Sequence, residues 1–259
     1  MKIDNLVQNF FLKNPECTFK VLGIGENNIY LDLQPYGINA LYLNAMVEQQ
    51  WVDRYHQANQ TRFSGALTLP GWVLCDLFLV PAAIGIITCP AKYISPQWRP
   101  PDLKDDDEAI AAAFYAAPHL KPGTFVGVSL FSCREGIGVG AIVKAITLKM
   151  LKAKTQIGIT QWSSHSLRIH TRLGNLKVLG PAPGHDLAKN SFVYSIALDD
   201  STRPPSEGYW VGLDDTRVLN QIMTQVCRGE SKIEILAPGL SSDGAKIYLR
   251  QEHISRNIS

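Results

Sequence analysis

The chain has 259 residues, of which 46% are hydrophobic and 19% charged, a composition typical of a globular protein with a sizeable core. Its formal net charge of +2 gives no reason to expect nucleic acid or a membrane surface as a partner. The five widely spaced cysteines include no CxxC pair, which argues against a disulfide framework or a zinc site. Because no secretory signal pattern is apparent either, we predict a cytoplasmic protein with reduced thiols.

The N-terminal part of the chain shows helical and strand patterns in turn. Apolar spacing predicts an amphipathic helix over residues 3–13 and strands over 18–22 and 28–33, which a glycine-containing turn would join into a hairpin. A longer helix is predicted over residues 40–57, where apolar side chains recur at helical spacing.

The most apolar region of the chain runs from residue 64 to residue 91. Prolines, glycines and Asp76 interrupt it, so two buried strands at about 72–80 and 83–89 fit better than a membrane-spanning helix. Asp76 is the only acid in this run. It is a candidate base for removing a proton from an amine, and the alternative is an edge residue that faces water.

A run of acidic residues follows a proline-rich connection at residues 93–103. Acids favour the first turn of a helix, so residues 105–108 predict the start of a helix that ends near residue 117. Adjacent helical positions point apart and no histidine stands at ligand spacing, so we predict no metal site here.

The central segment, residues 124–175, begins with a strand, a glycine turn and a helix. Such a turn leaves backbone N–H groups at a helix N-terminus that suit a phosphate. No Asp or Glu occurs from Gly136 to His185, whereas several lysines and arginines do. The alternative is that the glycines only allow tight packing and the lysines form a solvated face.

Two common phosphate-binding motifs do not fit this segment. The P-loop pattern GxxxxGK[ST] is absent from it. A dinucleotide-binding turn expects an acid about 20 residues after its glycines to hold a ribose, and no acid occurs before Asp186. A different anionic ligand is therefore expected.

The segment resembles the coenzyme-binding motif of the GNAT superfamily of acyltransferases. In that family a strand ending in Val-x-Pro precedes (Arg/Gln)-x-x-Gly-x-(Gly/Ala) and a helix. Aligned without gaps, the motif positions are occupied by Val128, Leu130, Cys133, Arg134, Gly136 and Gly138, where Arg134 takes the place of the usual glycine beside the Arg/Gln. The spacing is retained, but the Arg/Gln is replaced by Cys133.

The residues that follow resemble the next part of the family pattern, a strand and an Asn-x-x-Ala-x-x-x-Tyr-x-x-x-Gly-Phe helix. Residues 156–162 read as the strand, Ser163 falls at the asparagine and His170 at the tyrosine. Family tyrosines at that position protonate the departing coenzyme A thiolate, and a histidine, with a usual pKa of about 6.5, could do the same. The alternative is a histidine that merely packs.

The resemblance implies an α/β fold with a mixed, mostly antiparallel sheet flanked by helices. We expect a GNAT-like domain over residues 1–200 and a C-terminal α/β extension over 201–259. Apolar patterns add strands at 176–179, 192–198, 232–236 and 246–250, and a helix at about 214–227.

The resemblance also implies an activity: transfer of an acyl group from acetyl-CoA or another acyl-CoA to an amine of a small-molecule or peptide acceptor. The pantetheine arm would pair with strand 125–131, which includes Val128. The pyrophosphate would lie on the turn formed by Cys133, Arg134, Glu135, Gly136, Ile137, Gly138 and Val139, and Ser163 belongs to the same expected coenzyme site. His170 is the expected proton donor to sulfur and Asp76 the expected base.

Two other functions remain open at this point. Loss of the family Arg/Gln, Asn and Tyr at Cys133, Ser163 and His170 is compatible with a GNAT-shaped protein that binds a ligand or partner without transfer. A hydrolase that uses Cys133 as its nucleophile would need a base to activate the thiol.

Overall fold

The computed structural model describes residues 3–23, 40–44, 48–63, 83–182, 191–198 and 207–254. The chain forms two compact units, residues 1–153 (unit 1) and 154–259 (unit 2). The boundary falls inside the segment expected to form one domain, residues 1–200. The strands predicted at 28–33 and 72–80, and Asp76 with the latter, lie outside the described residues.

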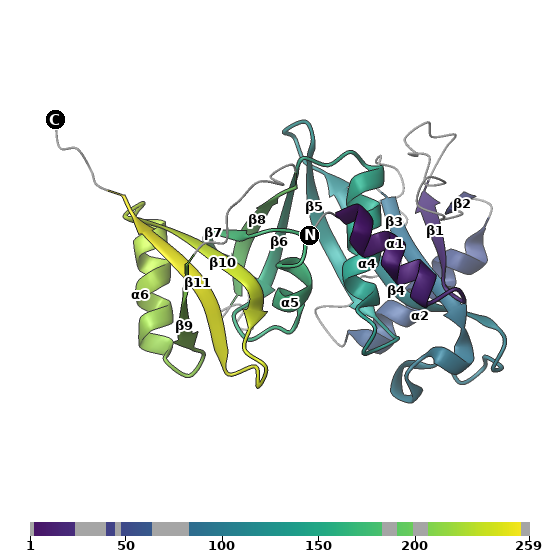
Figure 1. Cartoon of the computed structure of the whole chain (residues 1–259). Helices are drawn as coiled ribbons and strands as arrows, with labels where there is room; N and C mark the ends of the chain where they lie inside the picture. Colours follow the sequence, from purple (N-terminus) through teal and green to yellow (C-terminus); the bar gives the residue numbers. More distant parts are fainter. Residues whose placement is uncertain are drawn as a thin grey trace. The chain divides into compact units, whose positions relative to one another are not determined.

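Unit 1 is a sheet flanked by helices (Figure 1). Its strands are ordered β2-β1-β3-β4-β5, and all described pairs are antiparallel except β1 with β2, which is parallel. The elements are α1 (Ile3–Lys13), β1 (Thr18–Gly23), β2 (Ala40–Asn44), α2 (Gln49–Arg62), β3 (Ala83–Pro90), η3 (Ala91–Tyr93), η4 (Pro96–Trp98), β4 (Glu108–Pro118), β5 (Thr124–Ser132) and α4 (Val139–Met150). The predicted mixed, mostly antiparallel sheet flanked by helices is confirmed.

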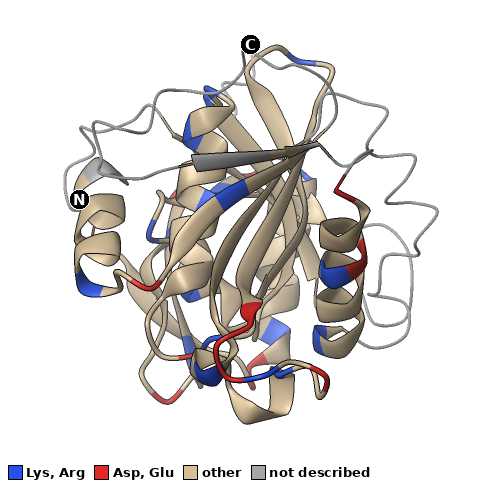
Figure 2. Ribbon diagram, turned by 90° about the vertical axis from the view of Figure 1, so that its right-hand side faces the viewer, with Lys and Arg blue, Asp and Glu red and all other residues tan. Residues whose placement is uncertain are grey.

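Helices α4 and α2 cover opposite faces of the unit 1 sheet. The ring of Phe114 on β4 lies 5.7 Å from Nζ of Lys144 on α4. Burial, with a smaller contribution from Tyr55 on α2, raises the pKa of the neighbouring Tyr115. Successive residues of a strand point to opposite faces, so β4 is enclosed on both sides. In Figure 2 the strands of this unit carry almost no charged residues.

The helix predicted over residues 105–117 is wrong, because β4 occupies most of that range. The middle of β4 is fully buried. A strand covered on both faces loses the alternation of polar and apolar residues that would identify it, and its alanine-rich run reads as helix. Asp105 and Asp106 lie in the preceding turn, in ion pairs of 2.8 and 2.7 Å with Arg99 and Lys92.

The helix predicted over residues 40–57 is correct only in its second part. Ala40–Asn44 forms strand β2, which pairs in parallel with β1. The helix α2 begins at Gln49 and buries Trp51, Val52 and Tyr55. The pairing of β2 depends on a partner far away in the sequence, which local periodicity does not reveal.

Gly85 on β3 allows α4 to approach the sheet. A Cβ at this position would lie 1.8 Å from Oγ1 of Thr147 on α4 and 3.2 Å from the ring of Phe19. We expect Gly85→Ala to lower the free energy of unfolding by about 1–3 kcal/mol through overpacking, measured by urea denaturation. The double variant Gly85→Ala/Thr147→Ala should recover part of the loss, because it lacks the nearest clashing atom. A Gly85→Ala protein as stable as wild type would contradict this packing.

Unit 2 is a second sheet with one face covered by helices. Its strands are ordered β6-β8-β7-β10-β11-β9, and the described pairs between β6 and β8, β8 and β7, β7 and β10, β10 and β11, and β11 and β9 are antiparallel. The elements are β6 (Thr155–Gln161), α5 (Ser166–His170), β7 (Leu176–Pro181), β8 (Ser191–Ala197), β9 (Tyr209–Gly212), α6 (Thr216–Cys227), β10 (Ser231–Leu240) and β11 (Lys246–His253). The predicted helix and strands beyond residue 201 are confirmed, and β9 was not predicted.

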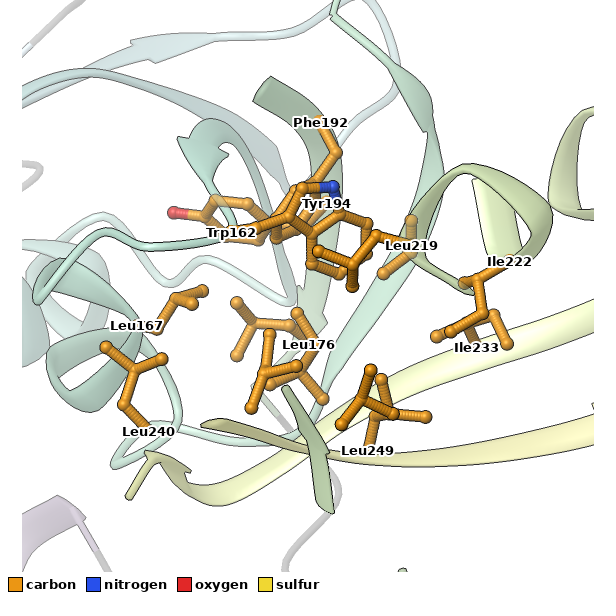
Figure 3. Close-up of a cluster of buried hydrophobic side chains, with 14 of the residues drawn as sticks. Trp162, Leu167, Leu176, Phe192, Tyr194, Leu219, Ile222, Ile233, Leu240 and Leu249 are labelled. Atoms are coloured by element: carbon orange, nitrogen blue, oxygen red, sulfur yellow. The ribbon is translucent and has the colours of Figure 1, made fainter. Parts of the chain in front are cut away.

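The core of unit 2 lies between its sheet and the helices α5 and α6 (Figure 3). Trp162 stacks on Phe192 with ring centroids 4.2 Å apart. Leu219 and Ile222 of α6 face the same core. The Asp215 carboxylate accepts a 3.0 Å hydrogen bond from the backbone N–H of Val218 and so caps α6 at its N-terminus.

Candidate functional site

The turn between β5 and α4 is built from glycines in left-handed conformation. Gly136 has φ +84° and Gly138 has φ +76°, and Gly138 is the N-cap residue of α4 without a side-chain cap. The backbone N–H groups from Gly136 to Gly140 have no acceptor among the described residues. A row of N–H groups at the positive end of a helix is suited to bind an anion such as phosphate.

The first half of the expected phosphate turn is already hydrogen-bonded. The N–H groups of Cys133 and Arg134 both donate to the carbonyl of Ala111, at 2.8 and 3.1 Å. The N–H of Glu135 donates to Oγ of Ser95 at 3.3 Å. The N–H groups open to an anion are therefore those that follow Glu135.

The side chain of Arg134 makes its contacts outside the glycine turn. Its guanidinium forms a 2.6 Å ion pair with Glu16 and lies 4.8 Å from the ring centroid of Tyr93. It also donates to Sγ of Cys17 at 3.4 Å. Arg134 thus stabilises the loop between α1 and β1. A phosphate at the turn would therefore be bound by backbone N–H groups and not by this side chain.

Glu135 ties the turn to η4 and α2. Its carboxylate accepts a 3.0 Å hydrogen bond from the Trp98 indole and lies 4.0 Å from the Arg62 guanidinium. Arg62 in turn stacks on the Trp98 ring at 4.1 Å. These contacts hold the exposed turn in place and set a cation beside the only carboxylate in it.

Cys133 is 2% exposed, and burial raises the pKa of its thiol to about 12. A thiol with a raised pKa is protonated at neutral pH and is a poor nucleophile. The environment of Cys133 therefore argues against the cysteine hydrolase.

Strand β5 contains a β-bulge at Val128. Tyr115 pairs with Ser129 and Ala116 with Gly127, which leaves Val128 without a partner on β4. Val128 is 39% exposed. Bulges interrupt strand pairing, redirect neighbouring groups and are over-represented next to active sites. Gly127 inside the apolar run is the sequence signal that is typical of such a bulge.

In unit 2, His170 is packed rather than exposed. It is 5% exposed, and its ring lies 4.9 Å from the ring of Tyr194 with an interplanar angle of 32°. Gln156 donates to the Tyr194 hydroxyl at 3.4 Å. Gly158 makes room for that hydroxyl, because a Cβ there would lie 2.6 Å from it. Ser163 lies in the exposed turn after β6.

The cations of the acid-free stretch do not all point to solvent. Lys144 is completely buried in α4. Arg168 donates to the backbone carbonyls of Ser241 and Ser242. These two cations are thus buried or hydrogen-bonded within their own unit.

A cavity of about 240 Å³ lies on the unit 2 sheet. It is lined by charged side chains of β7, β10 and β11: Lys177, Lys232, Glu234, Arg250 and Glu252. Arg250 pairs with Glu234 at 2.7 Å and lies 3.6 Å from Glu252. The cavity is therefore lined by both positive and negative side chains, with one ion pair across β10 and β11 and one within β11.

Metal and membrane sites can be assessed for the described residues only. No group of three or more His, Cys, Asp or Glu side chains among them could hold a metal ion. No helix in that part of the chain is long and apolar enough to cross a membrane.

No protein-family model and no curated protein matches the chain. The solved structures that are similar to it include three of low sequence identity. The ribosomal-protein-S18-alanine N-acetyltransferase from Escherichia coli has a TM-score of 0.42 and 8% identity, and the match covers 62% of this chain and 96% of that one. The protein yncA from Salmonella typhimurium, named a putative acetyltransferase and solved with its cofactor acetyl-CoA, has a TM-score of 0.38 and 12% identity over 64% and 96% of the two chains. A protein from Acinetobacter baylyi that is named a putative acetyltransferase has a TM-score of 0.40 and 11% identity over 74% and 98% of the two chains.

Proposed function

We propose that this protein is an acyl-CoA-dependent acyltransferase that transfers an acetyl or other acyl group to an amine. The observation that carries the proposal is the row of backbone N–H groups from Gly136 to Gly140, which has no acceptor among the described residues. The pyrophosphate of coenzyme A would accept hydrogen bonds from these groups. The left-handed glycines keep side chains out of its way.

The bulge at Val128 supports the same proposal. Where a strand loses its partner, backbone N–H and C=O groups become available to a ligand. Val128 lies on the strand that leads into the phosphate turn, at the position of the family valine. The amide groups of a pantetheine arm would hydrogen-bond to β5 beside this residue.

In the proposed reaction a bound acyl-CoA supplies a thioester that an amine attacks directly. His170 is the proposed proton donor to the leaving sulfur, and its pairing with Tyr194 would hold the ring in one orientation. Asp76 is the proposed base that accepts the proton from the amine. The acceptor is a small molecule or a peptide, and the protein itself is proposed to act in the cytoplasm.

The first test is calorimetric titration with acetyl-CoA and longer acyl-CoAs. We expect saturable one-to-one binding to the wild type and loss of binding in Gly136→Val, because a side chain at this left-handed position strains the turn and obstructs the anion site. Gly229→Val is the matched control: Gly229 has φ +66° and, like Gly136, has nothing within 4 Å of an added Cβ. It should bind like wild type. Absence of binding to the folded wild type would contradict the proposal.

Turnover separates the enzyme from a protein that only binds. Release of free coenzyme A that depends on an added amine would support transfer. Tight acyl-CoA binding without release across a broad amine panel would favour the GNAT-shaped binding protein.

A further inference from the structure

Two thiols of unit 1 face each other across strands β1 and β3. Thr18 pairs with Thr88 in the antiparallel ladder. Cys17 is the residue before β1 and Cys89 follows Thr88 on β3, so the two cysteines lie at the same end of this strand pair. Each thiol shifts the pKa of the other, which indicates that the two are neighbours. Opposite residues of an antiparallel pair have Cβ atoms about 4.5–5.5 Å apart, close to the separation of about 3.5–4.5 Å that a disulfide requires.

A cation lies beside this pair. The Arg134 guanidinium donates to Sγ of Cys17 at 3.4 Å and is held in position by Glu16 at 2.6 Å. The interaction with Cys17 lowers the pKa of Cys89, and Arg134 lowers it further, whereas the interaction with Cys89 and burial raise the pKa of Cys17. Positive charge next to a thiol favours the reactive thiolate.

We propose that Cys17 and Cys89 are an oxidative modification site that forms a reversible disulfide with a small oxidant such as hydrogen peroxide. The Cys89 thiolate attacks one peroxide oxygen, the O–O bond breaks, and Cys89 sulfenic acid and hydroxide form. Sγ of Cys17 then attacks the sulfenic sulfur, an S–S bond forms, and the S–O bond breaks. The thiol protons end in the two water molecules produced; both sulfurs are oxidised and the peroxide is reduced.

Burial limits which oxidant reaches the pair. Cys17 is 6% and Cys89 1% exposed, so a molecule of nearly water size is admitted more easily than a bulky disulfide reagent. Cys133 is also buried, but burial raises its pKa to about 12, and it should remain reduced. The disulfide does not depend on the proposed acyltransferase function, although Arg134 lies at the beginning of the turn on which that function rests.

The test uses the full-length protein carrying Cys75→Ser and Cys227→Ser, which leaves Cys17, Cys89 and Cys133. The folded protein is treated with hydrogen peroxide, then unfolded, alkylated, digested and mapped by mass spectrometry. We expect the intact mass to fall by two hydrogens, a Cys17–Cys89 linked peptide, an alkylated Cys133, and recovery of both thiols with dithiothreitol.

Two controls keep the result decisive. Cys17→Ser, checked for folding by near-ultraviolet circular dichroism, should give sulfenic or further oxidised Cys89 and no internal disulfide. The wild type is mapped in parallel, so that the conclusion does not rest on a variant that fails to fold. The proposal is overturned if Cys17 and Cys89 both stay alkylatable after peroxide, if the disulfide joins Cys133, or if Cys89 ends as a sulfinic or sulfonic acid in place of the disulfide although Cys17 is present.

Discussion

Replacing Arg134 with methionine should lower the free energy of unfolding by about 2–3 kcal/mol. The side chain is 12% exposed and its partner Glu16 21%, and the two form a 2.6 Å ion pair. Methionine keeps much of the volume but leaves the carboxylate partly buried without its cation, which is the costly half of breaking such a pair. Urea denaturation at neutral pH measures the difference in the transition midpoint.

A double-mutant cycle separates the ion pair from packing. Glu16→Gln alone should also destabilise, whereas Glu16→Gln/Arg134→Met should be more stable than the sum of the single losses predicts, because no lone charge remains. A loss below about 0.5 kcal/mol for Arg134→Met would show that the pair behaves as an ordinary surface ion pair.

The contacts of Arg134 illustrate what the sequence revealed about the candidate site and what it did not. The order of strand, glycine turn and helix was readable, because periodicity and glycine are local signals, and Gly136 and Gly138 do adopt left-handed conformations. The ion-pair partner of Arg134 could not be predicted from the sequence. Glu16 lies more than a hundred residues away in the chain, and only the fold brings it to the turn.

The same distinction explains the fold predictions. Strands such as β8, with alternating buried and partly exposed residues, and the helix α6 follow local patterns and were predicted. The local pattern of β4 predicts a helix because both faces of the strand are covered, and that of β2 does so because the pairing of β2 with β1 is non-local. The four-residue strand β9 is too short to produce a pattern.

Replacing Lys144 with methionine should stabilise the protein. Lys144 is 0% exposed, and burial holds the pKa of its ammonium well below the ordinary value. Each pKa unit of depression corresponds to about 1.4 kcal/mol lost from stability at a pH where the unfolded chain is protonated. Methionine fills a similar volume without an ionisable group, so the free energy of unfolding at neutral pH should rise by more than about 1 kcal/mol.

The pH dependence provides the more specific measurement for Lys144. In the unfolded chain the lysine holds its proton up to about pH 10, whereas in the folded protein it releases the proton at lower pH. Unfolding therefore takes up a proton between these two values, and wild-type stability rises as the pH is raised through that window. Lys144→Met should lack this rise, so the two stability curves converge toward high pH and separate toward neutral pH. The exposed Lys121→Met is the control and should run parallel to wild type. If the curve of Lys144→Met also runs parallel to that of the wild type, the buried lysine keeps its charge in the folded protein. Interactions of the ammonium with the Phe114 ring and its other surroundings would then outweigh the cost of desolvation.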